Sequence, residues 1–231
     1  LTDQSGQSNN MTVGGTLTST KDCPSNVFST MNAVATSSFA TLTNGNNTLT
    51  GNSAANNGNS FSTLSLPDAR GKYYFEVKFN TIVGAEYPVV AICLTSDAEY
   101  GVILNGGAGD PRDRVIGMDP RGYIYNGSSN ASVFSALSNG DIASFAFDMD
   151  NGAYYMSING AAYLTSGNPT SGASRTGALV TWTPNSSNDY GIWISPYNNS
   201  VCSINFGNGF FGTSAVADNS TATASTPGVF N

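Results

Sequence analysis

Two carboxylates stand two positions apart in the stretch GDIASFAFDMDNGAYYMSING, residues 140–160. Paired acids can hold a metal ion, can act as an acid and a base, or can simply form a turn. A calcium loop of the EF-hand type beginning at Asp148 would need glycine at its sixth position and glutamate at its twelfth. Here Gly152 is the fifth residue and Asn159 the twelfth. We therefore expect Asp148 and Asp150 to belong to a hairpin turn rather than to a metal site.

A second pair of acids, Asp97 and Glu99, has the same spacing. In an extended segment the two side chains would share one face about 7 Å apart, which is within the range of the paired carboxylates of glycosidases. The alternative is that SDAEYG, residues 96–101, is a solvated loop with two ordinary surface acids. We favour the loop, in which Asp97, Glu99 and Tyr100 are candidate ligand-binding residues, over a glycan-cleaving enzyme.

The composition argues against several classes of function. The chain of 231 residues has no histidine, which excludes a Ser-His-Asp triad, a Cys-His pair and any histidine-bearing zinc site. Only 10% of the residues are charged and the net charge is −7, whereas a nucleic-acid partner needs clustered Lys and Arg. No apolar run approaches the ~20 residues that span a bilayer. We expect a protein that is not an enzyme, uses no cofactor or metal, and neither binds nucleic acid nor inserts into a membrane.

The segment NGGAGDPRDRVIGMDPRGYIYNG, residues 105–127, interleaves arginines with acids and tyrosines. One interpretation is that each arginine pairs with a neighbouring aspartate, so that the cluster neutralises itself. The other is that a loop rich in guanidinium groups, carboxylates and aromatic rings binds a polar ligand, either a sugar or a protein. The candidate binding residues in this segment are Asp110, Arg112, Asp113, Arg114, Tyr123 and Tyr125, and the same cluster contains Asp119 and Arg121.

A second candidate loop is TWTPNSSNDYG, residues 181–191, in which Trp182, Asn185, Asp189 and Tyr190 could contact a ligand. The competing interpretation of Trp182 is burial, because a tryptophan in a β-sandwich is more often part of the core. The other aromatic side chains that we assign to the core are Tyr73, Phe75, Phe145, Phe147 and Trp193.

The cysteines at positions 23, 93 and 202 have no metal-binding spacing. Cys93 lies in the apolar run VVAICL and Cys202 lies in SVCSINF. We expect both to be buried thiols in strands and expect no disulfide with Cys23.

Short strands are predicted to position these residues. Helix signals are nearly absent, while runs rich in aromatic and β-branched residues recur between turns. Asn-Gly pairs, as at Asn151 and Asn159, tolerate the positive φ angles of tight hairpins. The predicted strands are 72–79, 87–95, 142–149, 153–158, 190–197 and 200–207. The pattern predicts an all-β fold, an antiparallel sandwich.

The strand 142–149 is predicted to be covered on both of its faces, because both carry residues suited to burial. One face has Ala143, Phe145, Phe147 and Met149, and the other has Ile142, Ser144 and Ala146. Residues 44–63 are mostly polar, although they include Leu49 and Phe61, and are expected to form a long loop between two early strands.

Several of these segments together resemble the SPRY domain. They are GKYYFEVKF, then GDIASFAFDMDNGAYYMSING with its Asp-x-Asp-x-Gly hairpin and Asn-Gly turn, and finally YGIWISPYNNSVCSINFG, which ends in Asn-Phe-Gly. They occur in the family's order from about Gly71 to Gly207. The resemblance implies a concanavalin-like, bent antiparallel β-sandwich. It also implies a binding module whose ligands are held by loops at one end.

The N-terminal part resembles virion proteins of phages, especially marine phages. In those proteins a linker phrase and a lead-in phrase precede a SPRY domain, and TDQSGQSNNMTV and KDCPSNVFSTMNAV are similar to the two phrases. The matching residues are Asp3, Ser5, Gly6, Asn9 and Asn10 in the linker, and Asp22, Pro24, Ser25, Asn26 and Phe28 in the lead-in. The resemblance implies a virion protein on the surface of a phage particle.

We therefore predict three regions: 1–22 as a linker or the end of a preceding module, 23–211 as the sandwich, and 212–231 as a polar linker or tail. The predicted function is non-catalytic binding of a host-surface glycan or protein by a tail fibre or receptor-binding protein. Other virion subunits are expected partners, and trimers are common among fibre proteins. The alternatives are a structural virion subunit, such as a head decoration protein, and a glycan-cleaving enzyme.

Overall fold

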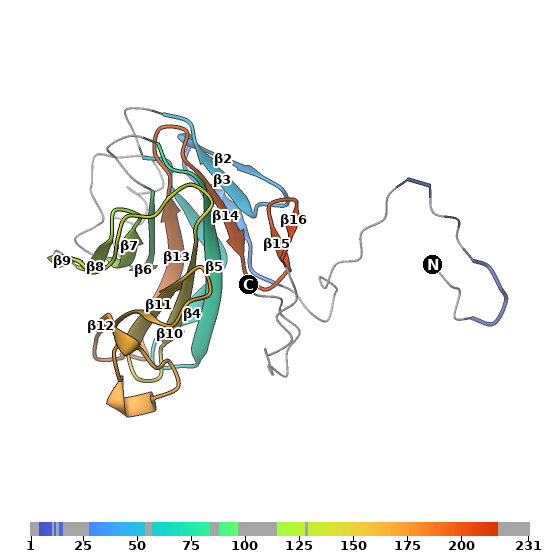
Figure 1. Cartoon of the computed structure of the whole chain (residues 1–231). Coiled ribbons are helices and arrows are strands. Elements are labelled where there is room, and N and C mark those ends of the chain that lie inside the picture. The colour runs from blue at the N-terminus through green and yellow to red at the C-terminus, as the bar shows by residue number, and fades with distance from the viewer. Residues whose placement is uncertain are drawn as a thin grey trace.

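The computed structural model describes residues 5–10, 12, 14–15, 28–53, 57–83, 88–96, 115–127 and 129–216. In this part of the chain two large antiparallel sheets face each other as a sandwich, with no α-helix and with two short 3₁₀ turns, η2 (Leu164–Ser166) and η3 (Gly172–Ser174) (Figure 1). Among these residues no helix has the length and apolar character needed to cross a bilayer. The predicted all-β sandwich is confirmed.

Each of the two sheets has seven strands. The first sheet has the order β1 (Met31–Thr36), β4 (Ser60–Pro67), β13 (Asp189–Ser195), β6 (Val89–Leu94), β7 (Val115–Asp119), β8 (Tyr123–Asn126) and β9 (Ser129–Ser132). The second has the order β12 (Val180–Thr181), β11 (Ala153–Ile158), β10 (Ile142–Asp148), β5 (Lys72–Thr81), β14 (Val201–Asn205), β3 (Thr48–Gly51) and β2 (Ala40–Thr43). A small hairpin, β15 (Phe210–Phe211) with β16 (Ser214–Ala215), lies beside β14 in Figure 1.

Every strand predicted from the aromatic and β-branched runs is present, as β5, β6, β10, β11, β13 and β14. The expected long loop at 44–63 is wrong, because this segment holds β3 and the beginning of β4. Leu49 and Phe61 are both fully buried, Leu49 in the core between the sheets and Phe61 in a second apolar cluster with Trp193. Strand β16 lies within 212–231, where a linker or tail was expected. The boundary between residues 22 and 23 falls outside the described residues and stays a prediction.

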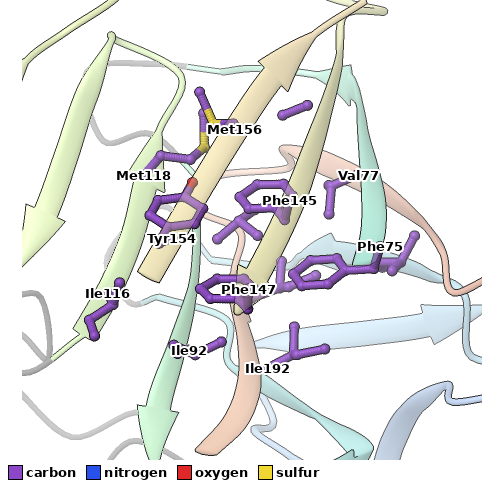
Figure 2. Close-up of a cluster of buried hydrophobic side chains, with 14 of the residues drawn as sticks. Phe75, Val77, Ile92, Ile116, Met118, Phe145, Phe147, Tyr154, Met156 and Ile192 are labelled. Carbon is purple, nitrogen blue, oxygen red and sulfur yellow. The ribbon is translucent and has the colours of Figure 1, made fainter. Parts of the chain in front are cut away.

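Aromatic side chains from the inner face of the second sheet form the centre of the core. Cross-strand pairing places Phe145 of β10 opposite Phe75 of β5, and their rings stack with centroids 4.8 Å apart. Phe147 stacks in the same way, also at 4.8 Å, on Tyr154 of β11. Figure 2 shows these four rings grouped together, with Ile92 and other apolar side chains around them. Such cross-strand aromatic pairs stabilise a sheet beyond the area that they bury.

The outer face of β10 is also buried, as predicted. Ser144, Ala146 and Asp148 point away from the core and are nevertheless almost fully inaccessible. Ala146 belongs to a separate apolar cluster with Tyr155, against which Tyr163 of the segment between β11 and β12 packs. The segment 159–179 is therefore part of the folded domain and covers this region of the second sheet.

The two cysteines in the described residues are free and buried, which confirms the interpretation of Cys93 and Cys202. Burial raises the pKa of the Cys202 thiol to about 12, because the thiolate would lose its hydration. Cys23 lies outside the described residues.

Replacing Phe145 by alanine would remove the ring that stacks on Phe75 and leave a cavity between the sheets. We expect Phe145→Ala to lower the free energy of unfolding by about 3–5 kcal/mol, measured by urea denaturation. The control is Val34→Ala in β1, since Val34 is 94% exposed and its truncation should change stability by less than about 0.5 kcal/mol. Equal losses in the two variants would contradict the assignment of Phe145 to the centre of the core.

Candidate functional site

Several loops from different parts of the chain meet at one end of the sandwich. They are the turn from β4 to β5, the hairpin from β10 to β11, the 159–179 segment with η2 and η3, and the loop from β12 to β13. Figure 1 shows the two 3₁₀ turns, in orange, at this end next to β12. The last three of these segments line an open hollow of about 270 Å³, here called the end hollow. Its lining residues are Asp150, Asn151, Ala173, Arg175, Trp182, Thr183 and Pro184.

The β10–β11 hairpin forms one wall of the end hollow, and the interpretation of its two acids as turn residues is confirmed. The Asp148 carboxylate pairs with the Lys72 ammonium and accepts hydrogen bonds from Asn151, from the backbone N–H at 3.1 Å and from Nδ2 at 2.9 and 3.1 Å. Asp150 Oδ1 accepts the backbone N–H of Gly71 at 2.7 Å. The first acid closes the turn, while the second joins it to the start of β5 and keeps one oxygen toward solvent.

Position 152 in this hairpin requires glycine, both because of a close contact and because of its backbone angle. Its φ is +65°, and a Cβ placed there would lie 2.3 Å from the Trp182 carbonyl oxygen. The backbone of the hairpin therefore packs directly on the chain that carries Trp182, and the Gly152 carbonyl accepts the Trp182 N–H at 3.0 Å. This contact sets the distance between two walls of the end hollow.

A buried carboxylate, Asp68, fixes the loop that contains Trp182. Asp68 is only 2% exposed. Its Oδ1 accepts the indole Nε1–H of Trp182 at 3.1 Å, and its Oδ2 accepts the backbone N–H of Asn185 at 2.9 Å. The half-buried indole also lies near the Tyr190 ring, with centroids 6.3 Å apart. Trp182 is thus held in one orientation by a polar contact and an aromatic contact.

Arg175 contributes the positive charge of the end hollow. Its φ of +48° lies in the left-handed region, which costs a residue with a side chain about 1 kcal/mol or more. Its Nη1 donates to the Trp182 carbonyl oxygen at 3.3 Å. The residue follows η3 and ends that turn.

The structure brings together only some of the residues expected to bind a ligand. Trp182 lines the end hollow, Asn185 follows on the same loop, and Asp189 is exposed at the start of β13. Tyr190 is not an exposed contact residue, because its side chain is buried in the core. The Asn185 side chain accepts the backbone N–H of Ser187 at 3.1 Å and so supports the loop. The remaining candidates, which are acids, arginines and one tyrosine of the other expected loops, lie outside the described residues and stay predictions: Asp97, Glu99, Tyr100, Asp110, Arg112, Asp113 and Arg114.

Residues 115–127 are not a loop, because they form β7 and β8. Tyr125 is only 2% exposed and its hydroxyl donates to the buried Asp119 carboxylate. Arg121 also donates to Asp119, from Nε at 3.2 Å and from Nη2 at 2.6 Å, and its guanidinium lies 5.0 Å from the centre of the Tyr123 ring. The interpretation of self-neutralising charges is therefore confirmed for Arg121, and Tyr125 is part of this cluster rather than an exposed contact.

Sequence reasoning missed Asp68 and Arg175. Arg175 is the last basic residue of the chain and the only one after Arg121, so its isolation in a polar segment was an available signal. Asp68 could not be connected with Trp182 from the sequence, because the two are 114 positions apart.

The comparisons with known proteins agree with this architecture. The sequence matches no protein-family model and no curated protein. Solved structures that share the fold include the SPRY domain of human HERC1, with a TM-score of 0.55 and 13% identity over 75% of this chain and 96% of that chain. The stonustoxin structure has a TM-score of 0.53 and 12% identity over 78% of this chain and 27% of that chain. The chain therefore has a SPRY-type, concanavalin-like sandwich fold.

Replacing Asp68 by alanine would leave the Trp182 indole and the Asn185 amide without their acceptor. We expect Asp68→Ala to cost about 1–3 kcal/mol of stability and to shift tryptophan emission to longer wavelength. The chain has 2 tryptophans, and Trp193 is buried elsewhere, so the shift would report on Trp182. The control Asp189→Ala removes an exposed acid and should leave the emission unchanged. An unshifted spectrum in Asp68→Ala would show that the carboxylate does not hold the indole.

The contacts of the Asp148 carboxylate predict that the stability of the protein falls at acidic pH. Burial alone would raise its pKa, but the hydrogen bonds from Lys72 and Asn151 outweigh burial and hold the pKa below its ordinary value of 3.8. Because the pKa is lowered in the folded state, this stabilisation is complete above pH 3.8 and is lost as the pH falls through the lower, folded value.

We expect Asp148→Asn to lower the free energy of unfolding at pH 7 by roughly 1–2 kcal/mol, with the difference from wild type narrowing below pH 3.8. Urea denaturation across pH would measure this. Asp150→Asn is the matched control, because an amide oxygen can still accept the Gly71 N–H. A difference that stayed constant down to the lowest pH would contradict the role of the Asp148 charge.

Proposed function

We propose that this chain is a non-catalytic binding module of a phage virion appendage, a tail fibre or receptor-binding protein, and that it recognises a host-surface glycan at the end hollow. The observation that carries this proposal is the chemistry of the hollow. One concave surface combines an aromatic side chain, Trp182, with a cation, Arg175, and an acid, Asp150. Sugars need this combination, because their C–H faces pack on rings while their hydroxyls bind charged and polar groups.

Hydrogen bonds within the protein also hold the walls of the hollow in place in the absence of a ligand. The indole is held by Asp68, the hairpin by Asp148 and Gly152, and the arginine by the Trp182 carbonyl. Pre-organisation of this kind reduces the entropy that binding would otherwise cost. A glycan is favoured over a protein receptor because the hollow is small, about 270 Å³, whereas protein partners bury about 800 Å² on each side.

The acids at this end support binding rather than catalysis. Asp68 and Asp148 are buried and are occupied by hydrogen bonds from the protein itself. Among the described residues that line the hollow, Asp150 is the one carboxylate, whereas glycoside hydrolysis usually requires a pair of carboxylates flanking the substrate.

The virion assignment rests on the N-terminal phrases that resemble those preceding SPRY domains in phage proteins. In this proposal the chain lies on the surface of the particle and contacts other virion subunits, with a trimer as the expected assembly. Antibodies raised against the chain should label an appendage on particles of the phage that encodes it, as seen by electron microscopy. Labelling of the capsid alone would contradict the appendage assignment.

The first experiment is an array of bacterial surface glycans probed with the purified chain. We expect selective binding that Ala173→Trp weakens at least tenfold, because the exposed Ala173 lines the hollow and an indole there would fill it. Ala162→Trp is the matched control, since Ala162 is exposed on the same 159–179 segment without lining the hollow. Equal binding by both variants would place the ligand elsewhere, and binding to no glycan would contradict glycan recognition.

A second candidate function, a structural virion subunit, is favoured by an apolar groove away from the end hollow. The groove has a volume of about 520 Å³ and is lined by Phe28, Leu64, Leu66, Phe75 and Phe206, among others. Leu64 is 55% exposed beside it. An apolar surface of this kind suits packing against a neighbouring subunit. Self-association of the purified chain that Leu64→Ser abolishes would favour this function, and a monomer at high concentration would argue against it.

A further inference from the structure

Arg175 differs from the other partly buried arginine of the described residues. Arg121 forms a bidentate pair with Asp119, and Lys72, although more exposed, pairs with Asp148. Arg175 forms no ion pair with any carboxylate in the described part of the chain, and its one side-chain hydrogen bond goes to a backbone carbonyl. In a chain of net charge −7, a half-buried guanidinium without a carboxylate partner is unusual.

One edge of the Arg175 guanidinium, formed by Nε and Nη2, makes no hydrogen bond to the described residues. Arginine has five N–H donors in a planar fork. The bond to the Trp182 carbonyl uses Nη1, so Nε and Nη2 have no partner among the described residues. These two nitrogens present parallel N–H groups whose spacing matches the two oxygens of a carboxylate. The unused edge therefore suits a planar, singly charged acid.

Asp150 limits which anion can enter the same hollow. Its Oδ1 is occupied by the Gly71 N–H, which leaves Oδ2 as an acceptor for a ligand hydroxyl. A phosphate group, with a charge of about −1.5 to −2, would be repelled by this acid more strongly than a carboxylate would. A ligand that carries one carboxylate and several hydroxyls satisfies Arg175 and Asp150 together. It can also lay a C–H face against Trp182, which lines the hollow.

We propose that the end hollow binds a carboxylated sugar, such as a uronic or sialic acid unit, with its carboxylate on the Nε–Nη2 edge of Arg175 and its hydroxyls on Asp150. This inference rests on the proposed function, because it names the class of sugar that the binding module recognises. It also assigns the two charged residues separate roles. Arg175 selects acidic sugars over neutral ones, and Asp150 selects sugars over small inorganic anions.

The test compares each glycan bound on the array with the same glycan after chemical reduction of its carboxylates to alcohols, using titration calorimetry. We expect the carboxylated form to bind at least tenfold more tightly than the reduced form. Arg175→Gln should remove this difference, and Arg175→Lys should restore only part of it, because a lysine lacks the planar fork. Arg70→Gln is the matched control, because Arg70 is an exposed arginine that does not line the hollow. Circular dichroism and urea denaturation would verify that every variant is folded.

The outcomes separate this inference from the function on which it rests. If neutral glycans bind as tightly as acidic ones and Ala173→Trp still abolishes binding, the glycan-binding function stands and the carboxylate inference is overturned. The inference also fails if acidic glycans bind and Arg175→Gln keeps the full preference, because the charge is then recognised elsewhere. If no glycan binds the folded chain, both are overturned.

Discussion

The burial of β10 on both faces is the constraint on which the rest of the structure depends. Its inner face supplies the phenylalanines that stack between the sheets. Its outer face carries small or polar residues, Ser144 and Ala146 among them, which are buried because another part of the chain covers them. The 159–179 segment packs against this region through Tyr163. The same segment then delivers Arg175 to the end hollow, so the cover of the sheet and the wall of the site are one piece of chain.

The walls of the hollow are joined by backbone contacts and by carboxylates that accept N–H groups from other loops, rather than by flexible surface ion pairs. Gly152 meets the Trp182 carbonyl, Asp68 receives the indole N–H, and Asp150 receives the Gly71 N–H. Each of these bonds connects two different loops. Hydrogen bonds in which the donor or the acceptor is charged are stronger than neutral ones, and breaking them costs more stability. The arrangement gives a polar site the rigidity that loops alone lack.

Local patterns in the sequence predicted the strands well, because β5, β10, β11 and β13 contain aromatic and β-branched runs bounded by turn residues. The strands β2 and β3 were hidden, because Ala-Thr-Leu-Thr and Thr-Leu-Thr-Gly are only four residues long and contain none of the aromatic residues that mark the other strands. Tyr123 and Tyr125 were expected in a loop, although Tyr-Ile-Tyr consists of the aromatic and β-branched residues that favour strands. The site itself depends on contacts such as Asp68 with Trp182, which no local pattern encodes.

The end hollow also has a place in the order in which the chain folds. Its lining residues come from the β10–β11 hairpin, the 159–179 segment and the loop before β13, and this loop is tied back to Asp68, just after β4. Asp68 and Asn185 are 117 positions apart in the chain, and contacts over such separations form slowly. During synthesis the loop can therefore be fixed only after Asn185 has been added, and a shorter chain offers no complete site at which a ligand could be captured prematurely.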